Sequence, residues 1–345
     1  MRKIGMISMM LLLLSSEFYA VPKVTTVMSG LDNPRGLAFG PEGALYVAEA
    51  GRGGGGPCVF LRGALQCYGP SGSVSRLWNG VQERILTGLP SQVSSAGEAN
   101  GPHDISFQGR GGAFVTIGFG GEPSLRAQFG PPGALFGTLI QVSAGGPWKV
   151  VADVSAHEAS ENPDNSPVKD TNPYGVLAEP GARIVADAGA NALLQVQPNG
   201  GISTIAVFPS RPQGRSTDAV PTSVVVGPDG AYYVGELTGF PFTPGAARVY
   251  RVVPGAAPEV FRDNFKTIID IAFGRDGSLY VLEHATGNGF SGPGDIIRVE
   301  PNGTRTTVYQ GLTRPGSILI GPNDEIYVSN RGTSVGTGEV LKIEL

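Results

Sequence analysis

The chain repeats one segment six times, and this repetition limits its possible folds more than any other feature. The clearest copy runs from Pro34 to Glu49 and reads PRGLAFGPEGALYVAE. Its counterparts begin at Pro102, Pro173, Pro221, Ile268 and Pro315, and the last three steps are about 47 residues long. A repeat of that length is typical of one blade of a β-propeller.

Each copy predicts four strands. A short apolar strand, a turn similar to Gly-Pro-Asp-Gly and a second strand that ends on a polar residue come first, as in residues 34–49. The turn residues supply the tight reversal of a hairpin. A third strand follows, as in residues 72–78, and then a fourth that alternates polar and apolar residues, as in residues 81–87. Polar outer strands protect the edge of a sheet, and four strands make one propeller blade.

The two ends of the chain predict how the ring closes. The sixth repeat ends after its third strand, over residues 339–345, and residues 23–31 resemble the fourth strand at residues 305–312. We therefore predict an all-β, six-bladed β-propeller over residues 21–345 in which the N-terminal strand completes the last blade. No segment has a sustained helical period, so we expect almost no helix.

Residues 1–20 have the layout of a secretory signal peptide. Arg2 and Lys3 precede an apolar stretch from Ile4 to Leu14, and Ala20 is a small residue suited to the cleavage site. The apolar stretch is short for a membrane span. We predict a secreted or periplasmic protein that is not inserted in a membrane once the signal is removed.

The charge of the chain excludes two classes of partner. The formal net charge is −4, and no run of Lys or Arg occurs. Nucleic acids and anionic membranes attract clustered basic residues, so the sequence predicts neither as a partner. We expect a monomer.

Cys58 and Cys67 are the only cysteines and lie nine residues apart in a glycine-rich insertion. Export favours a disulfide that closes this insertion. Two free thiols are the alternative, and a zinc site lacks the usual four ligands.

Extra chain length falls on one face of the predicted disc. The long segments are the connections from second to third strands and those from blade to blade, which emerge on the same face. They cover residues 51–71, 118–135, 237–245, 284–294 and 331–338, and residues 90–101, 155–172 and 209–220. Binding residues concentrate on such loops. The loop residues Phe119, Phe129, Phe240 and Phe242 are candidates for anchors of a protein partner or for a lid over the channel.

The same face receives a ring of polar residues. Second strands end on Glu49, Asp187, Glu236, Glu283 and Asn330, with Ile117 as the exception, and inner strands open on Arg35, His103, Tyr174, Thr222, Ile269 and Gly316. We expect both sets to surround the mouth of the central channel. Close carboxylates raise one another's pKa unless a cation neutralises them. The four carboxylates are therefore candidate ligands of a metal such as calcium. Arg35 is the alternative cation, and the third possibility is that the carboxylates are hydrogen-bonded struts between blades.

His103 departs from its repeat, because other blades carry Arg, Tyr or Thr at this position. It is the candidate catalytic residue, as a general base. His284 directly follows Glu283 at the mouth. The candidate ligand-binding residues are Arg35, His103, Tyr174, His284 and Asn330. The sequence has no nucleophile elbow, phosphate loop or clustered metal motif, so catalysis stays open.

The sequences of three segments resemble those of the ScyD/ScyE family, which is named for proteins of the scytonemin pigment cluster of cyanobacteria. These are residues 33–51, the motif Asn100-Gly101-Pro102-His103-Asp104 and residues 321–332, together with the cysteine-bearing insertion. The resemblance covers the whole mature chain. It implies an exported propeller of the NHL or TolB-like kind that acts late in the assembly or oxidation of an aromatic small molecule. It transfers no catalytic residues.

Two classes of function follow. The first is an exported protein that binds a small molecule or a partner on its loop-rich face. The second is a metal-dependent enzyme similar to calcium-dependent lactonases or quinone-dependent sugar dehydrogenases, in which mouth carboxylates hold the metal and His103 is the base. Convergence of three of the carboxylates favours the enzyme, and separate hydrogen bonds to the blades favour the binding protein.

Overall fold

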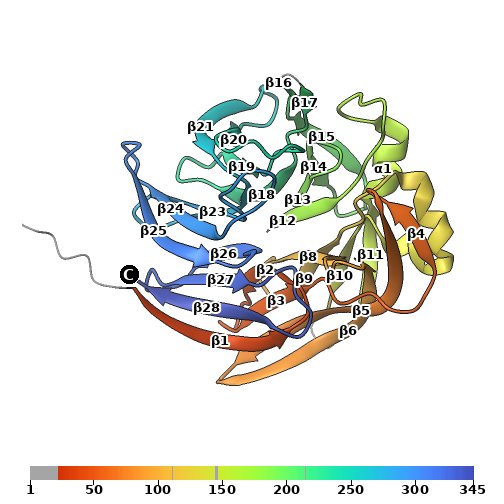
Figure 1. The fold of residues 1–345 in the computed structure, drawn as a ribbon, viewed down its shortest axis with the longest axis horizontal. Helices are drawn as coiled ribbons and strands as arrows, with labels where there is room; N and C mark the ends of the chain where they lie inside the picture. Colours follow the sequence, from red (N-terminus) through yellow and green to blue (C-terminus); the bar gives the residue numbers. More distant parts are fainter. Residues whose placement is uncertain (1–21, 111, 144–146, 214) are drawn as a thin grey trace, which may run out of the picture.

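The structure is a computed structural model that describes residues 22–110, 112–143, 147–213 and 215–345. Six antiparallel sheets of at least four strands surround a central axis, which confirms the predicted six-bladed β-propeller (Figure 1). The predicted signal peptide, residues 1–20, lies outside the described residues. No helix in the described part has the length and apolar character needed to cross a membrane.

Every blade runs from an inner strand at the channel to an outer strand at the rim. Blade 1 contains β2 (Pro34–Phe39), β3 (Leu45–Glu49), β5 (Ala64–Trp78) and β6 (Val81–Ser94), extended by β4 (Cys58–Leu61) and β7 (Ala99–Asn100). Blade 2 contains β8 (Pro102–Phe107), β9 (Ala113–Ile117), β10 (Thr138–Val142) and β11 (Trp148–Asp153). Blade 3 contains β12 (Pro173–Glu179), β13 (Ala182–Asp187), β14 (Ala192–Val196) and β15 (Ile202–Val207).

The other three blades keep the same order. Blade 4 contains β18 (Pro221–Val226), β19 (Tyr232–Glu236), β20 (Ala247–Val252) and β21 (Glu259–Phe265). Blade 5 contains β22 (Ile268–Phe273), β23 (Leu279–Glu283), β24 (Gly294–Val299) and β25 (Arg305–Leu312). Blade 6 contains β26 (Ser317–Ile320), β27 (Ile326–Asn330), β28 (Gly338–Glu344) and β1 (Lys23–Leu31).

Pairing of β1 with β28 closes the ring. The two strands are antiparallel, with Lys23 opposite Glu344 and Ser29 opposite Glu339. Figure 1 shows the first described strand, in red, beside the last one, in blue. The predicted closure by the N-terminal strand is therefore confirmed.

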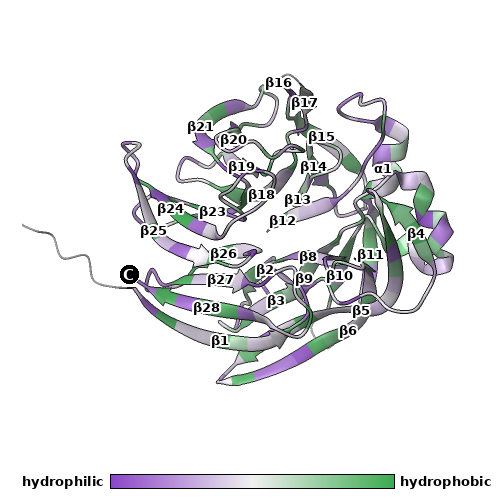
Figure 2. Ribbon diagram, viewed as in Figure 1, coloured by the Kyte–Doolittle hydropathy of each residue, from purple (hydrophilic) through white to green (hydrophobic). Residues whose placement is uncertain are grey.

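The core is divided among the blades. Buried aliphatic and aromatic side chains form several clusters, and the largest includes Tyr46 of β3, Val115 of β9 and Ile140 of β10. Hydrophobic residues lie along the strands of each blade, while most connections are polar (Figure 2). Apolar burial between neighbouring blades, worth about 25 cal/mol per Å², stabilises the ring.

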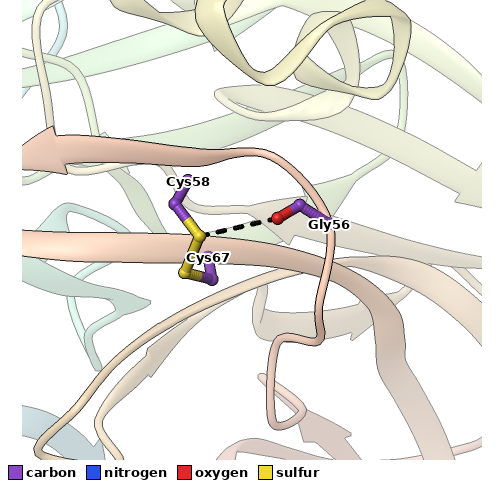
Figure 3. The surroundings of a disulfide bond; sticks show 3 residues. All are labelled: Gly56, Cys58 and Cys67. Atoms are coloured by element: carbon purple, nitrogen blue, oxygen red, sulfur yellow. Dashed lines mark hydrogen bonds between the residues drawn. A yellow bond between two sulfur atoms is a disulfide. The ribbon is translucent and has the colours of Figure 1, made fainter.

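The cysteine-bearing insertion forms a β-hairpin. In it, β4 pairs with the first residues of β5, and Cys58 lies directly opposite Cys67. The two cysteines form a disulfide, as predicted, and the Cys58 sulfur lies 3.5 Å from the carbonyl oxygen of Gly56 (Figure 3). The disulfide fixes an extension of blade 1 on the loop-rich side.

Other long connections contain short elements of their own. The 3₁₀ helices η1 (Pro123–Phe129) and η2 (Pro131–Leu135) follow β9, the helix α1 (Val154–Glu161) follows β11, and β16 (Arg211–Gln213) pairs with β17 (Arg215–Thr217).

Phe119 and Phe129, which the sequence suggested as anchors of a partner or as a lid over the channel, are neither. Both are fully buried and pack against Phe136 in the cluster between blades 1 and 2. The prolines that open η1 and η2 favour tight turns, and these fold the connection inward, so that its rings fill the core.

Candidate functional site

The predicted residues of the mouth lie at one end of the ring. Each second strand ends opposite the start of its inner strand, as Pro34 lies opposite Glu49 and Pro173 opposite Asp187. Blades 4 and 5 repeat the arrangement, with Pro221 opposite Glu236 and Ile268 opposite Glu283. The antiparallel pairing thus brings strand ends and strand starts to the same edge.

Four of the five polar strand ends accept a hydrogen bond from the connection that leads into their own blade. The acceptors are the side chains of Glu49, Asp187, Glu283 and Asn330, and the donors are the backbone N–H groups of Asp32, Asn172, Lys266 and Thr313, at 2.6–2.8 Å. A buried N–H needs a partner. These side chains are therefore struts that fix the blade-to-blade connections.

Glu49 is the most completely satisfied of the four. Its side chain is fully buried and also accepts hydrogen bonds from the hydroxyls of Ser73 and Ser75. The guanidinium of Arg84 binds both carboxylate oxygens, at 3.1 and 2.8 Å. All the acceptor capacity of Glu49 is used within blade 1 and the connection that precedes it.

Glu236 is the fifth polar residue at a strand end. Glu236 forms an ion pair with Arg211 of β16. Among residues 22–345, wherever the structure describes them, no group of three or more His, Cys, Asp or Glu side chains is arranged to hold a metal ion. Glu49, Asp187, Glu236 and Glu283 each bind groups near their own blade.

The residues that open the inner strands line the channel. A cavity of about 10 Å³, room for about one water molecule, is bordered by five of the six predicted residues: His103, Tyr174, Thr222, Ile269 and Gly316. The sixth, Arg35, lies beside them, with its Nη1 3.4 Å from the Tyr174 hydroxyl and its Nη2 donating to the Ala99 carbonyl at 3.0 Å. The sequence prediction therefore located the channel-lining positions.

His103 is buried at this level, with 1% of its surface exposed. Neither ring nitrogen has a hydrogen-bond partner among the described residues, and the ring packs on Tyr174 with centroids 4.5 Å apart. Gly118 leaves room for it, because a Cβ there would overlap the imidazole. Burial, and then the charge of Arg35, hold the His103 pKa well below its usual value. The imidazole is therefore neutral and available for hydrogen bonding.

His284 lies at the same mouth. Its Nδ1 donates to the Pro315 carbonyl at 2.8 Å, which leaves Nε2 as the acceptor, and Nε2 has no partner among the described residues. The ring stacks on Phe290 with centroids 4.8 Å apart. Burial lowers the His284 pKa to about 3. This histidine is also neutral at physiological pH.

Sequence reasoning missed two channel carboxylates, Asp104 and Asp270. Both border the small cavity, and each accepts a backbone N–H from the next blade, from Val176 and Ile318. Burial, and then the charge of Asp270, raise the Asp104 pKa well above its usual value, and burial raises that of Asp270 to about 6. Their shared repeat position, one residue after the channel residue, is the sequence signal that could have identified them.

A pocket of about 550 Å³ opens on the loop-rich face. Its walls come from the connections of blades 1, 3, 4 and 5, and its lining includes Arg62, Glu98, Asp170, Asn191, Asp218, Val220, Leu237, Thr238, Phe240, Phe242 and Phe290. It adjoins the channel mouth, because Phe290 stacks on His284. The predicted loop-rich face therefore contains a cavity of the size that ligands occupy.

Three phenylalanines give this pocket an aromatic wall. Phe240 and Phe242 meet edge to face with centroids 6.3 Å apart, and Phe242 contacts Phe290 at 4.6 Å. The guanidinium of Arg314 lies 5.2 Å from the Phe290 ring centroid. Phe240 is 66% exposed. Of the four predicted loop phenylalanines, Phe240 and Phe242 thus lie at the candidate site.

The backbone around the pocket is strained. Five non-glycine residues of its lining have positive φ angles: Asn191, Val220, Thr238, Phe242 and Phe290, at 51°, 57°, 73°, 56° and 64°. A β-branched residue such as Val220 or Thr238 rarely adopts this conformation. The Thr238 hydroxyl is also buried without a hydrogen-bond partner among the described residues. Such strain is concentrated at functional sites.

Acidic groups outnumber basic ones in the lining. Arg62 is paired with Asp170 at 2.8 Å, which leaves Glu98 and Asp218 without an ion pair among the described residues. Burial, and then the charge of Asp164, raise the Asp218 pKa. The pocket therefore favours positive or neutral hydrogen-bond donors over anions.

Neither a protein-family model nor a curated protein matches the sequence. Solved structures do match the fold. A Thermus thermophilus protein assigned as an oxidoreductase of the glucose dehydrogenase type has a TM-score of 0.58 and 17% identity, with 94% of this chain and 100% of that chain covered. A protein assigned as a gluconolactonase has a TM-score of 0.55 and 12% identity, with 95% and 93% covered.

Virginiamycin B lyase from Staphylococcus aureus is similar at a TM-score of 0.54 and 14% identity, with 94% of this chain and 100% of that chain covered. At such low identity these likenesses show the six-bladed fold alone, because one fold serves many unrelated functions.

Proposed function

We propose that this chain is an exported binding protein that holds one small, partly aromatic molecule in the pocket above the channel mouth. The observation that carries the proposal is the combination of a 550 Å³ cavity with an aromatic wall and a strained lining. Strained conformations cost about 1–3 kcal/mol each and persist where the surrounding structure enforces them. Four of them around one cavity, at Val220, Thr238, Phe242 and Phe290, point to a pre-organised site.

The ligand is neutral or cationic in this proposal. The aromatic wall of Phe240, Phe242 and Phe290 suits a planar ring. Glu98 and Asp218, which form no ion pair among the described residues, suit an amine or a hydroxyl donor. Of the mouth residues, His284 adjoins the pocket through its stacking on Phe290, and its Nε2 has no hydrogen-bond partner among the described residues. Asn330 supports the ring as a strut.

The metal-dependent enzyme has less support. The carboxylates predicted as metal ligands already accept hydrogen bonds or form an ion pair near their own blades. A general base works best with a pKa near the operating pH, and that of His103 is well below its usual value. These observations support hydrogen bonding by His103 more than proton abstraction.

Export and family membership are part of the proposal. The disulfide is compatible with an extracellular or periplasmic location. We propose that the chain belongs to the ScyD/ScyE family, because of the sequence resemblance described above. We also propose that it is a monomer in solution. Fractionation of cells that express the full chain, with N-terminal sequencing of the product, tests export; a cytoplasmic product that retains residues 1–20 would contradict it.

Calorimetric titration with a matched set of aromatic probes tests the binding. Tyramine, p-cresol and 4-hydroxyphenylacetate share one ring and differ in charge. We expect one site per chain, with tyramine or p-cresol bound more tightly than the acid. Phe240→Ala should weaken binding by about 2-fold to 10-fold, because an aromatic pair contributes about 0.5–1.5 kcal/mol.

Phe60→Ala is the matched control, because Phe60 is equally exposed, at 66%, and lies on the β4–β5 hairpin outside the pocket lining. Binding should be unchanged in this variant. Absence of heat with all three probes, or an equal loss in both variants, would contradict the proposal.

A further inference from the structure

Glu158 of α1 is a buried carboxylate that lacks both a hydrogen-bond partner and an ion pair in the described part of the chain. Its surface is 1% exposed, yet neither of its side-chain oxygens has a hydrogen-bond partner there. The strut Glu49, equally buried, accepts five hydrogen bonds. Burial of an unpartnered carboxylate is costly, so such a group binds a proton or a cation.

The surroundings of Glu158 supply further acceptor oxygens. Asn162, one turn later, has a buried Oδ1 without a partner among the described residues, and so does Asp170 through its own Oδ1. Asn162 is held close to Glu158, because its N–H donates to the Glu158 carbonyl at 3.1 Å. These unpartnered atoms are oxygens of the kind that hard cations bind.

The chain after α1 returns toward the helix. The Asn162 side-chain amide donates to the Ser166 carbonyl at 3.0 Å, and the Lys169 ammonium donates to the Ala159 carbonyl. Asp170 follows Lys169 directly, and its other oxygen is fixed by Arg62 at 2.8 Å. The residue before Asp170 therefore contacts α1, and Asp170 is near enough for its charge to act on Glu158.

Acidic groups outnumber basic ones around Glu158. Asp187, Asp164 and Asp170 lie close enough to Glu158 for their charges to act on it, and so does Lys169. Four carboxylates outnumber the two cations beside them, the Lys169 ammonium and the Arg62 guanidinium that pairs with Asp170, so a positive ion is favoured at this place.

We propose that the segment from α1 to β12 binds one calcium ion through the side chains of Glu158, Asn162 and Asp170. The three supply four oxygens, since Glu158 has two to offer. Calcium takes six to eight oxygens in flexible geometry and accepts waters, which reach the site from the partly exposed side at Asn162 and Asp170. This set has two carboxylates and one amide, so it differs from the strand-end carboxylates considered above. It does not rest on the proposed function, although Asp170 also belongs to the lining of the aromatic pocket.

Calorimetric titration of calcium chloride into chelator-treated purified protein tests the site, with magnesium chloride as comparison. We expect one calcium ion per chain, a higher midpoint of thermal unfolding and weaker binding of magnesium, which demands stricter octahedral geometry. Glu158→Gln should weaken calcium binding at least about tenfold, because calcium affinity depends on the number of charged ligands. Glu161→Gln, on the exposed face of the same helix, should bind like the parent protein.

Asp170→Asn is the second variant, in case Glu158→Gln does not fold, and it should also weaken binding. Three results would overturn the proposal: no calcium binding by the parent protein, calcium binding that Glu158→Gln leaves unchanged, or equal loss in Glu161→Gln. If calcium has no effect and Glu158→Gln is more stable than the parent protein only at alkaline pH, Glu158 is a buried protonated acid.

Discussion

Glu49 and Glu158 are both buried glutamates, but their surroundings are opposite. Glu49 ends a strand of the repeat and accepts hydrogen bonds from a backbone N–H, two serines and an arginine. Glu158 lies outside the repeat, in the connection between blades 2 and 3, and has no such partner among the described residues. The repeat supplies the same N–H donor in blade after blade, so a carboxylate within it is satisfied by the fold. A buried carboxylate outside the repeat needs another partner, such as a proton or a cation.

Replacement of Glu49 is the largest test of this comparison. Glu49→Ala should lower the free energy of unfolding by about 3–5 kcal/mol, because it leaves buried donors and part of the Arg84 charge without a partner. Urea unfolding followed by circular dichroism measures the effect. Glu83→Ala removes an exposed ion pair with Arg76 on the same blade and should cost less than about 1 kcal/mol. Similar losses in the two variants would mean that Glu49 is not a strut.

The pH dependence of stability tests whether the buried His284 at the channel mouth is neutral. The folded pKa of His284 is about 3, below its unfolded value, so the unfolded chain takes up the proton first. Stability should therefore fall as the pH drops from about 6.5 toward 3, by at most about 1.4 kcal/mol per pH unit from this residue.

In the His284→Asn variant, stability should decline less steeply as the pH falls below about 6.5. Above pH 7, the difference in stability between the variant and the parent protein should not change with pH. Asp270 contributes with opposite sign, because its folded pKa of about 6 lies above its unfolded value, so only the difference between the two proteins is interpreted. Parallel curves from pH 7 to pH 4 would show that His284 is not buried in its neutral form.

The disulfide hairpin contrasts with the ring that carries it. Reduction of Cys58–Cys67, or the double replacement by serine, opens a short loop, for which the chain-entropy model gives about 2–3 kcal/mol. We expect faster amide hydrogen exchange in β4 and the paired part of β5, and little change in blades 3 to 6. Uniformly faster exchange in all blades would show that the hairpin contributes to the stability of the whole ring.

The sequence predicted the ring and its closure because six copies of one pattern reinforce each other, and it placed His103 and Tyr174 at the channel for the same reason. It missed Asp104 and Asp270, although both occupy one repeat position. It could not predict the surroundings of Glu158, or the burial of Phe119 and Phe129. Those residues lie in insertions that occur once, where tertiary packing decides the structure and no second copy supports an interpretation.

The smallest predicted effect concerns the strained lining of the pocket. Val220 has a φ of 57°, in a region that costs a β-branched residue about 1–2 kcal/mol and that asparagine tolerates. Val220→Asn relieves this strain but loses the packing of the partly buried valine side chain. The net result should be a rise of about 0.5–1 kcal/mol in the free energy of unfolding.

Val226→Asn is the matched control, because Val226 is exposed and ends the regular strand β18. There the same replacement should be neutral or destabilising, since asparagine is unfavourable in strands. If Val220→Asn is stabilising and also weakens aromatic binding, the native protein keeps its strained valine for the shape of the pocket. If it destabilises as much as Val226→Asn, the positive φ of Val220 carries no strain, and the argument for a pre-organised pocket then rests on Thr238, Phe242 and Phe290 alone.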